Sequence, residues 1–75
     1  MSLPRFTTIL DGASLCDVAS AIGGYNYYGY VRTNGEWIIL REKADESEYR
    51  YTVGANNYSS AWGSYASKTY TLPTI

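Results

Sequence analysis

The sequence predicts an α+β fold that is mainly β. We expect a three-stranded antiparallel meander over about residues 25–54, one short N-terminal helix over about residues 14–22, and short edge strands. Segments rich in β-branched and aromatic residues alternate with turn signals that contain Gly, Asn or Asp. One stretch before them shows the apolar spacing of a helix. The length of 75 residues suits a single domain, residues 1–75.

The N-terminal helix is predicted from the spacing of its apolar residues. Four of them occur at i, i+3, i+4 and i+7, which places them on one helical face: Leu15, Val18, Ala19 and Ile22. Ser14 and Asp17 resemble a capping box, and Gly23-Gly24 supplies a C-terminal stop. We therefore expect an amphipathic helix whose apolar side covers the sheet.

The meander is predicted from three strand-like runs, residues 25–32, 36–42 and 49–53. Asn34-Gly35 favours a two-residue type I′ turn between the first two runs. A compact polar turn between the second and third runs places Lys43 opposite Glu48, a favourable pair of opposite charges. The remaining elements are expected to be two short strands and a short helix, at residues 5–10, 68–72 and 58–66.

The predicted first turn sets the register of the meander and so divides its side chains between two faces. The first face is nearly all apolar and is expected to be the core: Tyr27, Gly29, Val31, Ile38, Leu40, Glu42, Tyr49, Tyr51 and Val53. The second face mixes aromatic rings with arginines: Tyr28, Tyr30, Arg32, Trp37, Ile39, Arg41, Arg50 and Thr52. This register also puts Arg41 opposite Arg50. That pairing is unfavourable unless a carboxylate from elsewhere lies between them or the second turn contains a bulge.

The second face is the candidate binding surface. Tryptophan, tyrosine and arginine are the residue types enriched at binding hot spots, and arginine packs favourably over aromatic rings. The candidate binding residues are Tyr28, Tyr30, Arg32, Trp37, Arg41 and Arg50. The alternative is a solvated sheet face. The chain's nine tyrosines suit a sheet and an interface equally well.

Several function classes lack their characteristic residues. The chain has no histidine, the commonest general base, and shows no carboxylate pair, nucleophile motif or phosphate-binding loop of the required spacing. Cys16 is the only cysteine, so neither an internal disulfide nor a zinc site has enough ligands. We therefore expect a protein that acts by binding and not as an enzyme, with no catalytic residues, metal or cofactor.

Charge and hydropathy restrict the expected partners. Seven acidic and six basic residues give a net charge of −1, whereas a nucleic-acid-binding domain usually carries a basic surface. No apolar run approaches the roughly 20 residues that span a bilayer, and the N-terminal residues lack the features of a signal peptide. Synthesis in a cytoplasm is expected, without membrane association.

A set of aromatic, glycine and turn residues carries a family resemblance. It consists of Tyr27-Tyr28-Gly29-Tyr30, Trp37-Ile38-Ile39-Leu40-Arg41, Tyr51-x-x-Gly54, Tyr58-x-x-x-Trp62, Ala66 and Thr69-Tyr70. Over residues 25–70 the chain is similar to a small module that recurs among structural-region proteins of tailed bacteriophages. It departs from that module at Tyr65, where an arginine commonly precedes the alanine, and at the tight Asn34-Gly35 turn, where a longer turn is common.

The resemblance implies a structural or assembly protein of the virion, made in the host bacterial cytoplasm and present in many copies. Fibre, tail-adaptor and capsid-decoration roles all fit it. The implied partners are the chain itself, as a homo-oligomer, and larger virion proteins, and no catalytic site is implied. An exposed strand edge would offer such partners a pairing template.

Two alternatives remain open from the sequence. The chain could be a small regulatory or host-interaction protein that binds one bacterial target, in which case it would be absent from virions. It could also bind single-stranded nucleic acid by stacking bases on its tyrosines, and the affinity would then depend steeply on salt concentration.

Overall fold

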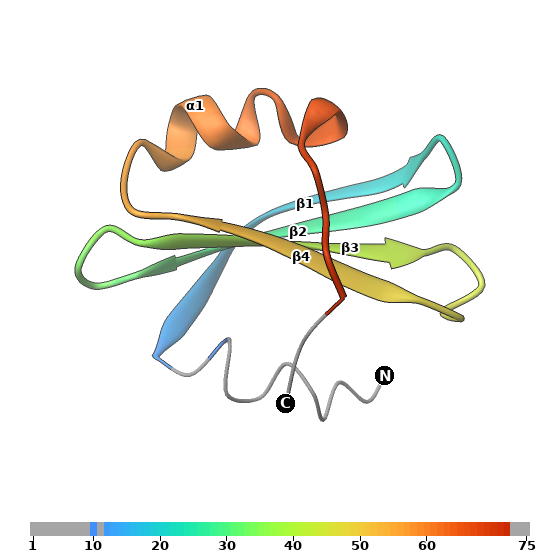
Figure 1. Ribbon diagram of the computed structural model, residues 1–75, viewed down its shortest axis with the longest axis horizontal. Coiled ribbons are helices and arrows are strands. Elements are labelled where there is room, and N and C mark those ends of the chain that lie inside the picture. The colour runs from blue at the N-terminus through green and yellow to red at the C-terminus, as the bar shows by residue number, and fades with distance from the viewer. Residues whose placement is uncertain (1–9, 11, 73–75) are drawn as a thin grey trace.

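Figure 1 shows a sheet of four antiparallel strands with a short helix over one of its faces. The computed structural model describes residue 10 and residues 12–72. The strands have the same order in the sheet as in the sequence: β1 (Ala13–Ile22), β2 (Tyr25–Arg32), β3 (Trp37–Lys43) and β4 (Tyr49–Gly54). Helix α1 (Tyr58–Trp62) and the 3-10 turn η2 (Tyr65–Ser67) follow. The predicted mainly β architecture and the meander over about residues 25–54 are confirmed.

The predicted helix over residues 14–22 is wrong, because this segment forms β1 and pairs with β2 as a fourth antiparallel strand. Two register irregularities explain the misleading spacing. One lies between Leu15 and Asp17, and the other between Ala19 and Ile22. Each adds one residue to β1, so side chains that share a face are three positions apart instead of two. The bulges in β1 therefore produce the three-residue apolar spacing that is typical of a helix.

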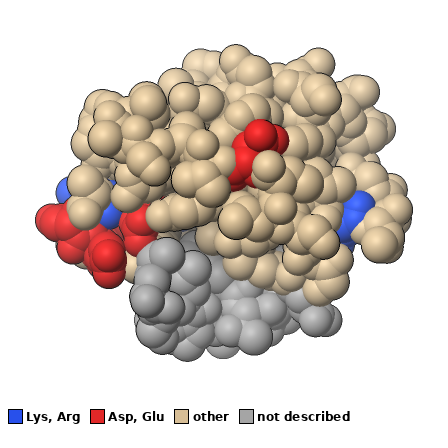
Figure 2. Space-filling model, turned by 180° about the vertical axis from the view of Figure 1, so that it is seen from behind, with Lys and Arg blue, Asp and Glu red and all other residues tan. Residues whose placement is uncertain are grey.

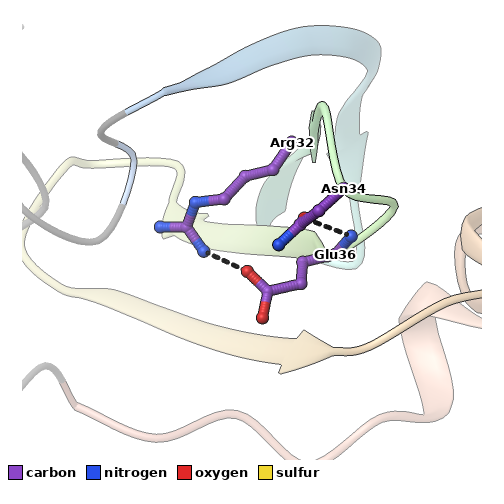
Figure 3. A network of polar contacts seen from close by, with 3 residues as sticks. All are labelled: Arg32, Asn34 and Glu36. Carbon is purple, nitrogen blue, oxygen red and sulfur yellow. Dashed lines mark hydrogen bonds and ion pairs between the residues drawn. The ribbon is translucent and has the colours of Figure 1, made fainter.

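The first hairpin turn is one residue longer than predicted. Arg32 N–H donates to Glu36 O at 2.8 Å, and Gly35 N–H donates to Arg32 O at 3.0 Å. Three residues therefore form the loop. Gly35 has a φ of 92°, but Asn34 lacks the positive φ that a type I′ turn needs at both central residues. The Asn34 side-chain oxygen accepts a hydrogen bond from Glu36 N–H at 3.1 Å (Figure 3). The turn is thus the three-residue kind in which glycine takes the left-handed position.

The extra loop residue changes which side chains of β2 share a face with those of β3. The observed pairs are Val31 with Trp37, Tyr30 with Ile38, Gly29 with Ile39, Tyr28 with Leu40 and Tyr27 with Arg41. The predicted assignment of β2 to the two faces is therefore wrong, since a slip of one residue moves every side chain of a strand to the other face.

The second hairpin has the predicted register. Lys43 N–H donates to Glu48 O at 2.9 Å, and Arg41 lies directly opposite Arg50 in a ladder without a bulge. In the connecting turn, Asp45 Oδ1 accepts from Ser47 N–H at 3.0 Å. The opposed arginines are thus a real feature of the sheet, and their surroundings are described below.

We call the face of the sheet under α1 the helix-side face and the other the opposite face. One cluster of buried side chains lies on the helix-side face: Tyr27, Trp37, Ile39, Ala61 and Tyr70. Ile38 and Leu40 alternate with these β3 residues, so they lie on the opposite face, where they are 0% and 1% exposed. Both faces of β3 are therefore buried.

Two glycines let large rings approach the sheet closely. A Cβ atom at Gly29 would overlap the Tyr58 hydroxyl and lie 2.9 Å from the Trp62 ring. A Cβ atom at Gly54 would overlap the Trp37 ring. The aromatic layer between α1 and the sheet thus depends on the absence of side chains at these two strand positions.

The other predicted elements are present in shorter form. The helix predicted over residues 58–66 ends at Trp62, with Gly63 as its C-cap, and η2 follows. The strand predicted over residues 68–72 reduces to a single antiparallel bridge between Thr71 and Tyr51 of β4. The strand predicted over residues 5–10 lies, apart from its last residue, outside the described residues.

Candidate binding surface

The six predicted binding residues do not share one surface. Strand alternation places three of them on the opposite face, namely Tyr28, Tyr30 and Arg32. It places the other three on the helix-side face, namely Trp37, Arg41 and Arg50. The structure therefore brings together a tyrosine pair and an arginine pair, but it does not join them.

Trp37 belongs to the core. Its side chain is 7% exposed, and its ring lies against Gly54. The indole N–H donates to Asn56 O at 2.6 Å, which satisfies the ring's only polar group. Lys68 Nζ lies 5.1 Å from the ring centroid. Trp37 holds the segment after β4 against the sheet and offers almost no surface to a partner.

Arg32 forms an ion pair within its own hairpin. Its Nη1 lies 3.3 Å from Glu36 Oε1, so the two side chains meet across the first turn (Figure 3). Both are partly exposed, and a pair of this kind contributes at most about 1 kcal/mol. The positive charge of Arg32 is therefore already paired with the carboxylate of Glu36.

Tyr28 is tied to a buried carboxylate. Its hydroxyl donates to Glu42 Oε1 at 2.7 Å, and the same oxygen accepts from Asn26 Nδ2 at 3.1 Å. Glu42 is 2% exposed. Burial, and then the bond to Glu42, raises the pKa of the Tyr28 phenol to about 12. The Tyr28 hydroxyl is therefore already hydrogen-bonded within the chain, while its partly exposed ring lies on the opposite face.

Two apolar side chains of β1 lie beside this tyrosine pair. In the β1–β2 ladder Leu15 faces Tyr30 and Val18 faces Tyr28, so all four are neighbours on the opposite face. Leu15 and Val18 are 53% and 52% exposed. Sequence reasoning missed both as surface residues because it placed them on the buried side of a helix. We call Leu15, Val18, Tyr28 and Tyr30 the β1 patch.

The β1 patch adjoins the outer edge of the sheet. β1 is the first strand in the sheet order and pairs only with β2 among the described residues, whereas the outer edge of β4 is bridged by Thr71. Figure 2 views the molecule from behind, the side on which β1 lies in Figure 1, and the described part of this surface is mainly uncharged. An unpaired edge beside exposed apolar side chains is a typical docking position.

The bulges of β1 limit how a partner can use this edge. They interrupt the regular ladder on both sides of residues 17–19, and Ala21 has a φ of 59°. Bulges of this kind protect edges against unwanted strand pairing. A partner is therefore expected to bind mainly through side-chain contacts with the β1 patch, and not through a long ladder of backbone hydrogen bonds.

The position of β1 is braced from the helix-side face. Tyr58 of α1 reaches over Gly29, and its hydroxyl donates to Asp17 Oδ2 at 2.7 Å. Burial and then this bond raise the pKa of the Tyr58 phenol. The contact joins α1 to β1 across β2, so the helix helps to hold the edge strand in place.

The arginine pair lies on the helix-side face near the second turn. The Arg41 guanidinium lies 4.4 Å from the centroid of the Tyr25 ring and 4.9 Å from that of the Tyr70 ring. Arg50 Nη2 lies 3.1 Å from Glu48 Oε2. Neither predicted relief of the opposed arginines is observed, because the ladder has no bulge and Glu48, two residues before Arg50, contacts Arg50 alone.

The described residues show no grouping of three or more Cys, Asp and Glu side chains that could hold a metal ion. Within that same part of the chain, no helix has the length and apolar character to cross a membrane. Comparisons of the chain with protein-family models, with curated proteins and with solved structures found no match.

Proposed function

We propose that this chain is a structural or assembly protein of a tailed-phage virion, and that it acts by binding other proteins and not by catalysis. The observation that carries the binding role is the β1 patch beside the unpaired edge of β1. The virion context is supported by the resemblance of residues 25–70 to a phage structural module. Copies of the chain itself and larger virion proteins are the proposed partners.

Burial of the β1 patch supplies the driving force in this proposal. Leu15 and Val18 are about half exposed, so covering each contributes roughly 1 kcal/mol. The rings of Tyr28 and Tyr30 add rigid area that costs little conformational entropy to bury. Such a contact is weak in a single copy, and it suits an assembly in which many copies act together.

The first experiment measures the mass of the pure protein by light scattering over a wide concentration range. We expect a discrete oligomer for the wild type. A double variant, Leu15→Glu with Val18→Glu, should be a folded monomer because it puts charge into the buried contact. Val53→Glu is the matched control, since Val53 is 55% exposed on the same face but lies on β4, at the other edge of the sheet.

Purified virions give the second readout. A virion protein should be present in them at a fixed ratio to the major structural proteins, and the double variant should be lost from them. A wild type that is monomeric at every concentration and absent from virions would overturn the proposal. That result would favour a regulatory protein that binds a host target.

A further inference from the structure

We infer that Arg41 and Arg50 form a binding site for a carboxylate side chain of a partner protein. This inference rests on the proposed function, because it concerns the chemistry of a protein partner. The site lies on the helix-side face beside β4, whereas the β1 patch lies on the opposite face beside β1. The two surfaces can therefore be tested separately.

Among the cations around the site, Arg41 has no carboxylate partner in the described part of the chain. Arg41 and Arg50 are directly opposed, and Lys43 lies two residues further along β3 on the same face. Glu48 is the carboxylate in contact with Arg50, and Asp45 of the connecting turn interacts with Lys43. The pKa of Glu48 is lowered by the hydrogen bond from Arg50 and further by the charges of Arg50, Lys43 and Arg41. Asp45 therefore offsets Lys43 and Glu48 offsets Arg50, which leaves Arg41 as the cation of this group without a carboxylate in contact. An added anion would pair with Arg41 and relieve its repulsion with Arg50.

Arg41 presents its hydrogen-bond donors without a carboxylate to receive them. The rings of Tyr25 and Tyr70 lie within 4.9 Å of its guanidinium, and such contacts cover the flat faces of the group. The N–H donors lie in the guanidinium plane and so remain directed away from the rings. Arg41 forms no ion pair with any described residue. The tyrosines thus orient a guanidinium whose donors match the two oxygens of a carboxylate.

Arg50 is incompletely bonded as well. Its Nη2 donates to Glu48, but its Nε is buried and has no acceptor among the described residues. A buried donor without an acceptor is unfavourable, and in native proteins such a donor is satisfied by another polar group or by an ordered water. Arg50 therefore lies beside Arg41 in the same ladder, and it has one donor that no described residue satisfies.

A carboxylate fits this site better than a phosphate of nucleic acid. The planar fork of a guanidinium binds a carboxylate through two parallel hydrogen bonds. Nucleic-acid binding needs an extended basic surface, but this chain is acidic overall, and its third described arginine, Arg32, is matched by Glu36. Arginine with tyrosine is also a typical composition of protein-binding hot spots.

Titration with a capped tetraglutamate peptide, followed by the NMR signals of the arginine Nε–H groups, tests the inference on the intact chain. The signals of Arg41 and Arg50 should shift to saturation, while that of Arg32 should not. Arg41→Gln should weaken the affinity by about tenfold, the effect expected from losing a charge-assisted hydrogen bond. Arg32→Gln removes the same charge elsewhere and should leave the affinity nearly unchanged.

Arg41→Lys is the second variant, because a lysine keeps a cation beside the two tyrosine rings but lacks the fork. It should remain folded and also bind the peptide more weakly. Equal losses with Arg41→Gln and Arg32→Gln would overturn the inference, since they would show attraction by overall charge. Tighter binding of an oligothymidylate of the same charge would overturn it too, in favour of phosphate. Loss of oligomers in the β1 double variant, without any peptide binding by the wild type, would refute this site but leave the proposed function standing.

Discussion

Replacing Gly29 with alanine should destabilise the protein strongly, although the change adds a single methyl group. That methyl would occupy the position of the Tyr58 hydroxyl and approach the Trp62 ring to 2.9 Å. Overpacking of this kind costs about 1–3 kcal/mol. Moving Tyr58 aside also breaks its bond to Asp17, which adds about 1–2 kcal/mol because Asp17 is only half-buried and regains water. The expected total is about 2–5 kcal/mol.

This loss is large for a chain of this size, whose stability is expected to be roughly 4–11 kcal/mol. Chemical denaturation followed by tryptophan fluorescence would measure it, and thermal unfolding should show a decrease of Tm by roughly 10–40 °C. Gly63→Ala is the matched control. Gly63 has a φ of −63°, and a Cβ atom there would meet its nearest neighbours at 3.5 Å, so the change should be neutral or slightly stabilising.

A double-mutant cycle separates the clash from a general effect of the extra methyl group. Tyr58→Phe alone should cost about 1–2 kcal/mol, because it leaves Asp17 without its donor. In the Gly29→Ala background the same change should cost almost nothing, since the hydroxyl has already been displaced. The coupling free energy should therefore be about 1–2 kcal/mol. Additive effects of the two changes would refute the packing described for Gly29.

Two further predictions concern Trp37 and Tyr28. Trp37→Ala should lower the free energy of unfolding by about 3–5 kcal/mol, because it removes a ring that is 7% exposed and its bond to Asn56 O; a loss below about 1 kcal/mol would contradict the core position of Trp37. The pKa of Tyr28 is raised from 10.0 to about 12, so the folded state holds this proton more tightly than the unfolded state. Its contribution to stability should be complete below pH 10.0 and decrease as the pH rises to about 12. Denaturation at several alkaline pH values should show a smaller decrease for Tyr28→Phe than for the wild type, and equal slopes would contradict the assignment.

Most strand positions could be predicted from the sequence because their signals are local. Aromatic and β-branched residues at alternating positions, followed by turn residues, mark β2, β3 and β4 within a residue or two of their observed ends. The second hairpin register followed from pairing Lys43 with Glu48 across a short polar turn. It also placed Arg41 opposite Arg50, so the arginine pair of the candidate site could be predicted from the sequence.

The other parts depended on contacts between distant segments. Asn34-Gly35 is compatible with a two-residue and a three-residue turn, and the three-residue turn places Gly29 on the helix-side face, where Tyr58 and Trp62 need the space. This single choice moved Tyr28 and Tyr30 away from Trp37 and Arg41. The predicted six-residue surface was divided for that reason.

The sequence by itself determined that the chain forms an aromatic antiparallel meander with tight turns, because alternation and turn chemistry depend on neighbouring residues. Only the tertiary structure decided the form of residues 13–22 and the side of the sheet on which each β2 side chain lies. A bulge exists only relative to a partner strand, so the spacing of Leu15 and Val18 has no unique meaning until β2 is placed beside them. The β1 patch could therefore not be found from residue spacing, since pairing with a distant strand creates it.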